Sequence, residues 1–190
     1  MKKYKKNLIC IVGRTSSGKD YIAKRLSTIF DIPQVVSHTT RPKRDNETDG
    51  IEHYFDSKEK FQNVLDNQKV IAYTKIGDYE YCATVDDIKQ DSIYIIDYDG
   101  LMKLKQRYHQ YFNLVVVYVY CDEDIRKERA SGRSDFETEW AKRNKAEDEQ
   151  FTRLEMNRDY DIIIDNSEPL DFSKIRDKIR KAMSRYERVY

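Results

Sequence analysis

Short apolar runs alternate with longer amphipathic stretches along this chain. The runs are rich in Ile and Val and carry few charges, as strands covered on both faces do. They predict strands at residues 7–12, 34–36, 93–96, 114–120 and 161–164. The stretches between and after them predict helices at residues 19–30, 101–111, 123–130, 140–157 and 172–186. This alternation predicts an α/β fold with a parallel core sheet and helices on both of its faces.

Two stretches depart from the alternation. Residues 37–92 contain a polar loop, a predicted helix at 58–67 and strand-like segments at 70–76 and 79–85, which together suggest a small α+β insertion. Residues 131–139 are polar and join two charged helices, as a mobile lid does. We therefore expect one domain over residues 1–190, with a core (1–36, 93–130 and 158–190), an insertion (37–92) and a lid (131–157).

The charge balance excludes some partners. With 35 basic and 34 acidic side chains the net charge is +1, which gives no general attraction to nucleic acid or to an anionic membrane. The three cysteines are scattered without a C-x-x-C spacing, which argues against a disulfide framework or a zinc site and favours the cytoplasm. The apolar run at residues 8–12 is too short for a signal peptide or a membrane span.

A glycine-rich segment follows the first predicted strand and precedes the first predicted helix. Its residues are Gly13, Arg14, Thr15, Ser16, Ser17, Gly18, Lys19 and Asp20. The spacing G-x-x-x-x-G-K in this context is that of a P-loop, whose backbone N–H groups surround phosphates while the lysine reaches the β- and γ-phosphates. An ordinary polar turn is the alternative. Asp20 stands where the usual motif has a Ser or Thr hydroxyl on Mg²⁺, and a carboxylate can also ligate that ion.

A second motif is more specific. Residues 36–50 carry every fixed element of V-S-x-T-T-R-x-x-R-x-x-E-x-x-G, and this segment resembles the substrate loop of guanylate kinases. Further family-like landmarks follow in order at residues 77–81, 95–100, 129–133, 143 and 160–166. The resemblance implies a three-layer P-loop kinase fold with an inserted nucleoside monophosphate (NMP)-binding region and a helical lid.

The resemblance also implies an activity, the ATP-dependent phosphorylation of a nucleoside monophosphate, with GMP as the first expected acceptor and with Mg²⁺. We expect ATP on the P-loop and on Asn166. Lys19, Arg44, Arg133 and Arg143 would neutralise the transferring phosphoryl group. The expected acceptor-binding residues are Ser37, Arg41, Arg44, Glu47, His53, Tyr81, Thr84 and Asp99, and the candidate Mg²⁺ ligands are Asp20 and Asp97. The expected partners are small-molecule nucleotides, with neither nucleic acid nor membrane, and the protein would be a monomer or a homodimer.

The chain differs from the family pattern at the positions that contact the base. Ala72 lies nine residues before Tyr81, where guanylate kinases have a guanine-contacting glutamate, and Ala83 replaces a serine or threonine. A second phosphate-binding tyrosine has become His53. Thr84, Asp78, Glu80 or Asp99 could substitute.

Two alternatives to a guanylate kinase therefore stay open. One is an enzyme similar to ribose 1,5-bisphosphate phosphokinases, which often have a G-K-D P-loop and lack the guanine-contacting glutamate. The other is a non-catalytic guanylate-kinase-like binding module, although such modules have typically lost the P-loop that this chain retains.

Overall fold

The computed structural model describes residues 5–45, 47–132 and 136–186. Within these residues a four-stranded sheet forms the core, in the order β6 (Ser92–Ile95), β1 (Lys6–Val12), β7 (Phe112–Tyr120) and β8 (Ile162–Asp165). All three pairings are parallel, with β1 paired to β6 and β7, and β7 to β8. The predicted α/β fold with a parallel core sheet is therefore confirmed.

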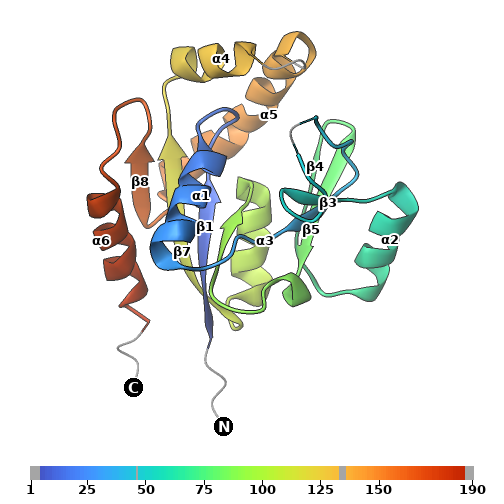
Figure 1. The fold of residues 1–190 in the computed structure, drawn as a ribbon, viewed down its shortest axis with the longest axis horizontal. Helices are drawn as coiled ribbons and strands as arrows, with labels where there is room; N and C mark the ends of the chain where they lie inside the picture. The colour runs from blue at the N-terminus through green and yellow to red at the C-terminus, as the bar shows by residue number, and fades with distance from the viewer. Residues whose placement is uncertain (1–4, 46, 133–135, 187–190) are drawn as a thin grey trace.

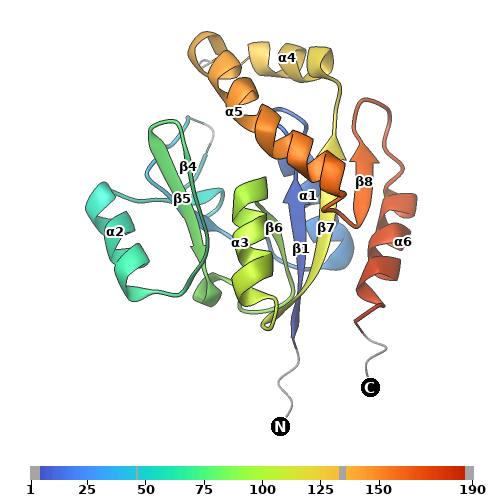
Figure 2. The ribbon, with the colours of Figure 1, turned by 180° about the vertical axis from the view of Figure 1, so that it is seen from behind.

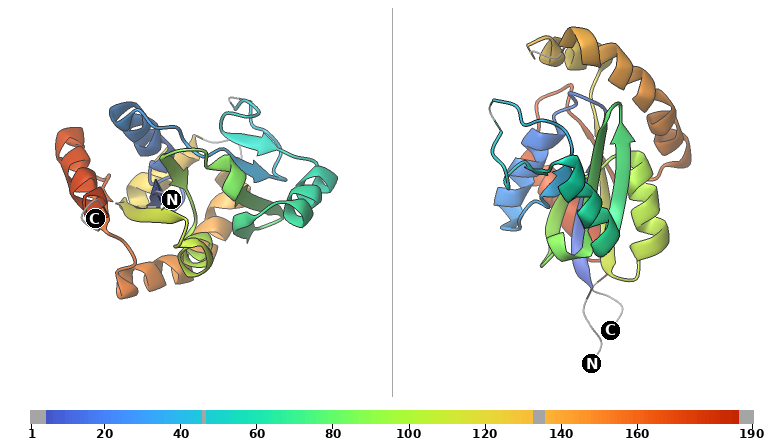
Figure 3. Two further views of the ribbon diagram at one scale, coloured as in Figure 1. Left: turned by 90° about the horizontal axis from the view of Figure 1, so that it is seen from below. Right: turned by 90° about the vertical axis from the view of Figure 1, so that its right-hand side faces the viewer.

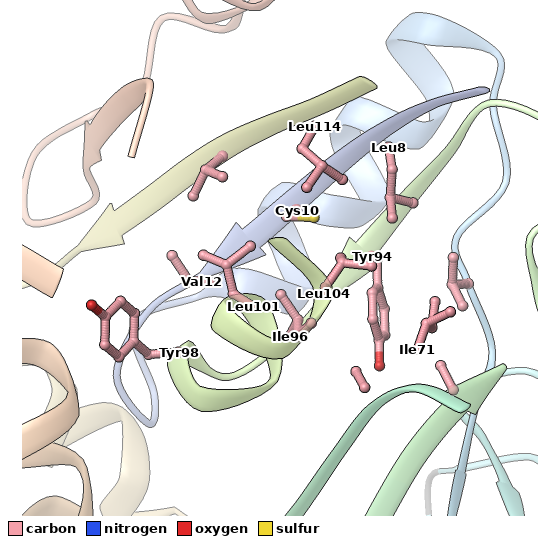
Figure 4. Close-up of a cluster of buried hydrophobic side chains, with 14 of the residues drawn as sticks. Leu8, Cys10, Val12, Ile71, Tyr94, Ile96, Tyr98, Leu101, Leu104 and Leu114 are labelled. Carbon is pink, nitrogen blue, oxygen red and sulfur yellow. The ribbon is translucent and has the colours of Figure 1, made fainter. Parts of the chain in front are cut away.

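Helices cover both faces of this sheet, as the alternation predicts. Figures 1 and 2 show α1 (Lys19–Phe30) and α6 (Phe172–Met183) on one face, and α3 (Tyr98–Tyr108) and α5 (Phe136–Asn157) on the other. Alternate residues of β1 supply the two core clusters: Ile9 and Ile11 join the α1 side, whereas Leu8, Cys10 and Val12 join the α3 side. Figure 4 shows the second cluster, with Leu101 and Leu104 of α3 packed against the sheet. Burial on both faces explains why these strands are so apolar.

A second sheet lies beside the core (Figure 1) and has the strand order β3 (His53–Phe55), β2 (Ser37–Thr39), β5 (Tyr79–Thr84) and β4 (Val70–Ile76). The β2–β3 pair is parallel, and β5 is antiparallel to both β2 and β4. Helix α2 (Lys58–Asn67) packs Phe61 and Val64 against Cys82 on one face of this sheet. The opposite face adds Ile71, Ala72 and Ala83 to the core cluster on the α3 side. The two sheets therefore share one hydrophobic core.

Helices α4 (Glu123–Ser131) and α5 lie over the end of the core sheet at which its parallel strands finish (Figure 3). Helix α5 is described from Phe136, four residues before the predicted start. No helix in the described part of the chain is long and apolar enough to cross a membrane.

The structure corrects three predicted boundaries. Residues 34–36 are not a strand of the core sheet, because only Gln34 forms an isolated bridge with Ile93 before the chain leaves for β2. Helix α3 begins at Tyr98 and not at residue 101, because the Asp97 carboxylate caps it by accepting a hydrogen bond from the Gly100 N–H at 3.0 Å. The polar loop after residue 36 contains the three-residue strands β2 and β3, whose sequences carry no strand-like alternation long enough to predict them.

Candidate active site

A cavity of about 290 Å³ lies where the P-loop, the second sheet, β6 and α5 meet. The P-loop lines it with Gly13, Thr15, Lys19 and Asp20. The acceptor region lines it with Ser37, Arg41, Arg44, Glu47, His53 and Tyr81. Helix α5 closes it with Arg143, Ala146, Glu147, Gln150 and Phe151. Two sets of phosphate-binding candidates that are far apart in the sequence therefore face one space.

The P-loop joins β1 to α1 and is supported from behind by Asn166. Gly18 caps α1 with a φ of 89°, and a Cβ atom there would lie 2.3 Å from the Asn166 amide nitrogen. That amide nitrogen donates to the Ser17 carbonyl oxygen at 2.8 Å. Only glycine fits both the backbone angle and the space. Asn166 thus shapes the loop and does not line the cavity.

The loop places a lysine and two buried hydroxyls at the positive end of α1. Lys19 donates from Nζ to the carbonyl oxygens of Gly13 at 2.6 Å and Arg14 at 2.9 Å. The buried hydroxyls of Ser16 and Ser17 have no hydrogen-bond partner among the described residues. A helix N-terminus with oriented N–H groups and a nearby lysine is an anion-binding arrangement.

Helix α5 contacts the P-loop through two carboxylates. Glu147 accepts hydrogen bonds from the Thr15 backbone nitrogen at 2.8 Å and from its hydroxyl at 2.7 Å. Asp148 pairs with Arg14 at 2.5 Å, so the Arg14 side chain points to the lid helix. Sequence reasoning missed Glu147, although its spacing of four from Arg143 places both residues on one helix face.

A buried arginine joins helices α4 and α5 to the P-loop. Arg126 of α4 is 3% exposed and donates to the Cys121 carbonyl oxygen at 3.2 Å and to the Asn144 side chain at 3.0 Å. Its guanidinium also lies 5.5 Å from the ring centre of Trp140 and reaches the Thr15 carbonyl oxygen at 3.4 Å. These contacts fix where α5 begins relative to the phosphate-binding loop.

Three neighbouring strands of the second sheet present the acceptor-binding candidates on one face. Ser37 of β2 is in register with His53 of β3, and the Ser37 hydroxyl lies 2.9 Å from His53 Nδ1. The His53 and Tyr81 rings are 5.9 Å apart in an edge-to-face arrangement. Burial, and then the positive charge of Arg41, lower the pKa of His53, so the imidazole is neutral at neutral pH.

Glu47 holds the two acceptor-loop arginines in place. Arg41 is 7% exposed and donates two hydrogen bonds to the Glu47 carboxylate, at 3.0 and 2.7 Å. The same carboxylate accepts from the Arg44 backbone nitrogen at 2.9 Å. Burial raises the pKa of Glu47, but the hydrogen bonds from Arg41 and Arg44 outweigh it and leave that pKa below its usual range. Glu47 therefore orients Arg41, while the half-exposed side chain of Arg44 faces the cavity.

The other face of the second sheet carries a charged cluster. His38 Nδ1 lies 2.6 Å from Asp56 Oδ2, and its Nε2 lies 3.8 Å from Asp87 Oδ1. Asp87 is the main cause that raises the pKa of His38; burial opposes it, and Asp56 adds to it. The histidine thus connects β2 to the segments that precede α2 and follow β5.

Two of the expected acceptor-binding residues lie away from the cavity. The Thr84 hydroxyl donates to Asp87 Oδ2 at 2.8 Å and caps the 3-10 helix η1 (Val85–Asp87). Asp99 lies on α3 and pairs with Arg153 at 3.0 Å. The structure brings neither to the other acceptor-binding candidates. Arg133, the expected lid arginine, falls outside the described residues.

The candidate Mg²⁺ ligands Asp20 and Asp97 both line the cavity. Burial raises the pKa of Asp97, and hydrogen bonds from Gly100 and Thr74 oppose it. In the part of the chain that the structure describes, no group of three or more His, Cys, Asp or Glu side chains could hold a metal ion. Two carboxylates beside a phosphate-binding loop nevertheless suit Mg²⁺, which in phosphotransfer sites takes one or two carboxylates, phosphate oxygens and water.

Comparisons with known proteins agree with this geometry. The sequence profile described as Guanylate kinase matches residues 5–186. A guanylate kinase of Clostridioides difficile (strain 630) is 30% identical over 97% of this chain and 94% of its own length. The guanylate kinase of Symbiobacterium thermophilum is 31% identical over 84% of this chain and 78% of its own length. The crystal structure of guanylate kinase from Anaplasma phagocytophilum superposes with a TM-score of 0.68 at 21% identity, covering 98% of this chain and 88% of that one, and supports the fold.

Proposed function

The chain belongs to the guanylate kinase family of phosphotransferases, and we propose that it transfers the γ-phosphoryl group of ATP to the phosphate of a nucleoside monophosphate, with GMP as the preferred acceptor. One observation carries the proposal: the P-loop and the acceptor-binding face line the same cavity. A kinase of this kind must hold two phosphate groups close together and must neutralise their charge.

ATP would bind with its β- and γ-phosphates on the P-loop. The N–H groups at the start of α1 and the Lys19 ammonium supply the positive potential for them. To reach the phosphates, Lys19 would exchange its present bonds to Gly13 and Arg14 for phosphate oxygens. The Ser17 hydroxyl, which is buried without a partner in the described structure, would gain one.

The acceptor phosphate would bind on the face that carries Ser37, His53 and Tyr81. Arg41, held by Glu47, and Arg44 supply positive charge there. An oxygen of this phosphate attacks the γ-phosphorus of ATP, the bond from that phosphorus to the β–γ bridging oxygen breaks, and ADP and a nucleoside diphosphate result. Arg44 of the acceptor loop and Arg143 of α5, which both line the cavity, would neutralise the charge of the transferring phosphoryl group, with Arg133 as a further expected contributor.

Asp20 and Asp97 would hold Mg²⁺ together with the phosphates of ATP. When bound, this ion would neutralise part of the negative charge on the phosphates. Asp20 lies in the first turn of α1, next to Lys19, where a hydroxyl ligand is usual, and a second negative charge there favours a divalent cation. We also propose that the protein acts in the cytoplasm as a monomer or homodimer on small-molecule nucleotides.

The direct test is an ADP-release assay with ATP and Mg²⁺ and a panel of GMP, dGMP, AMP, CMP, UMP and ribose 1,5-bisphosphate. We expect the highest kcat/KM with GMP, and a loss of at least about 100-fold in Lys19→Ala because the main cation on the ATP phosphates is gone. Lys24→Ala, an exposed lysine on the same helix and outside the cavity, is the matched control and should keep wild-type activity.

Ribose 1,5-bisphosphate belongs to the panel because of Ala72 and Ala83. These side chains offer no polar atom to a base. A sugar bisphosphate has no base, so it would not need such a contact. Preference for this acceptor would replace the proposed function. Absence of turnover with every acceptor would favour a binding module.

A further inference from the structure

Ala72 lines the cavity beside the acceptor-binding face, and Ala83 is its paired neighbour in the core. Ala72 of β4 and Ala83 of β5 are directly paired, and they are 4% and 0% exposed. Neither side chain can form a hydrogen bond. The four side chains named above as possible substitutes, Asp78, Glu80, Thr84 and Asp99, do not line the cavity. Selectivity for a base therefore needs a group from another part of the wall.

One hydroxyl comes from β4 itself. Thr74 lies two residues beyond Ala72, so both side chains point to the same face of the strand. Thr74 is in register with Tyr81 of β5, which places its hydroxyl between Ala72 and the phosphate-binding face. Thr74 lines the cavity and contacts Asp97, since its hydrogen bond lowers the pKa of that carboxyl.

A second hydroxyl comes from the core sheet. Tyr94 of β6 packs in the same cluster as Ala72 and Ala83, is 4% exposed and lines the cavity. Figure 4 shows its ring standing out from β6, with the oxygen at the end turned away from Leu8 and Cys10 and toward the second sheet, on the side of Ile71. The Tyr94 hydroxyl thus reaches the cavity from β6 of the core sheet.

The Tyr94 hydroxyl has no hydrogen-bond partner among the residues that the structure describes. Other tyrosines of the core differ: Tyr98 donates to Asp159 at 2.6 Å and Tyr118 contacts Glu155. The hydroxyl opens onto the cavity, and a cavity-facing hydroxyl with no partner in the protein can form a hydrogen bond with a ligand. Burial also raises the pKa of Tyr94 well above its usual range, so the group stays a neutral hydroxyl that can both donate and accept.

Resting on the proposed function, we propose that Tyr94 and Thr74 are the specificity-determining residues of this site, and that their hydroxyls hydrogen-bond to the base of the acceptor nucleotide. A carboxylate accepts hydrogen bonds only and so selects a base edge that carries N–H donors. A hydroxyl fits donors and acceptors alike. The site can then hold guanine through both hydroxyls, but it rejects other purines less strongly than a carboxylate site does.

The experiment measures KM and kcat for GMP, IMP and AMP with the wild-type protein, Tyr94→Phe and Thr74→Val. Each variant removes one hydroxyl and keeps the shape of the side chain. We expect the KM for GMP to rise about 5- to 20-fold in each. The KM for ATP should stay unchanged in Tyr94→Phe, whereas Thr74→Val also removes a hydrogen bond to Asp97, a proposed Mg²⁺ ligand. In each variant the ratio of kcat/KM for GMP to kcat/KM for AMP should fall. Tyr98→Phe is the matched control because the Tyr98 hydroxyl is already paired and does not line the cavity.

A measurement of thermal stability distinguishes a role of Tyr94 in binding the base from a role in stabilising the fold. Tyr94→Phe should keep or raise Tm, since it removes an unpaired hydroxyl, whereas Tyr98→Phe should lower it. An unchanged KM for GMP in both Tyr94→Phe and Thr74→Val, with an active wild-type protein, overturns this proposal alone. A wild-type protein that phosphorylates no nucleoside monophosphate overturns the proposed function and this proposal with it.

Discussion

Glu147 of helix α5 binds Thr15 of the P-loop through both of its carboxylate oxygens, at 2.8 and 2.7 Å. The backbone N–H of Thr15 belongs to the loop whose amides are expected to surround the ATP phosphates. A negative side chain thus lies beside the place where the protein would bind a strongly negative ligand. ATP binding and this contact oppose each other electrostatically.

The Glu147→Gln variant tests that opposition. Removal of the charge should strengthen ATP binding about 3- to 10-fold, because one repulsive interaction with the phosphates is lost. Titration calorimetry with a non-hydrolysable ATP analogue measures it. Glu149→Gln, an exposed residue on the same helix that does not line the cavity, should leave the affinity unchanged. Weaker binding in Glu147→Gln would mean that the contact helps to form the ATP site.

Glu47 should control the acceptor site through Arg41. In Glu47→Gln a neutral amide replaces the carboxylate, so the paired hydrogen bonds to Arg41 and the bond from the Arg44 backbone are weakened. We expect the KM for the acceptor to rise about 10-fold, with little change in the KM for ATP. Steady-state kinetics in each substrate measure this, and Glu59→Gln on the exposed side of α2 is the control. Equal increases in both KM values would contradict a role confined to the acceptor.

His38 should make stability depend on pH. Its folded-state pKa is raised, so its contribution is fully present below its unfolded-state pKa and is lost as pH rises through the folded-state pKa. We expect the free energy of unfolding to fall as pH increases above about 6.5. His38→Gln should cost about 1.5 to 3 kcal/mol at pH 6 and less at pH 9. Urea denaturation across this range measures it.

The control for that series is His109→Gln, which alters an exposed histidine at the end of α3. It should keep the wild-type slope of stability against pH. A wild-type slope that survives in His38→Gln would assign the pH dependence to other groups.

Gly18 and Gly77 offer a matched pair for backbone and steric effects. Both have positive φ angles, 89° and 59°, but only Gly18 has a neighbour, the Asn166 amide, in the way of a Cβ atom. Gly77→Ala should cost about 1 kcal/mol, from the left-handed backbone alone. Gly18→Ala should cost at least about 2 kcal/mol and abolish ATP binding. Thermal unfolding with and without nucleotide measures both effects, and equal losses would exclude a steric role for Asn166.

Local sequence predicted the parts of the site that are contiguous. The P-loop needs only its own residues and the strand and helix beside it, so Gly13 to Asp20 could be assigned directly. The four strands of the core sheet and the helices could also be predicted, because the periodicity of their apolar residues is a local property of the sequence. Residues 34–36 look like a further strand, but Val35 forms its hydrogen bond to β6 just before the chain turns away.

The other residues of the site could not be predicted, because their positions depend on contacts between segments that are far apart in the sequence. Thr84 and Tyr94 are ordinary strand residues in the sequence, and only the docking of the two sheets turns the second into a cavity residue. Thr84 lies near the expected base but caps η1, a local role that competes with ligand binding. Glu147 was within reach of helical spacing from Arg143, yet no pattern indicates that its partner is Thr15.

The position of Ala72 has a consequence for how the choice of substrate can change. Ala72 lines the cavity and also packs in one cluster with Leu101 and Leu104 of α3, so the surface that would meet a base is also part of the hydrophobic core. A carboxylate introduced at position 72 would be desolvated, and the cost would be borne by folding before any substrate was bound. A change of acceptor through this position therefore requires compensating changes in the core. The same residue affects both the choice of base and the free energy of unfolding.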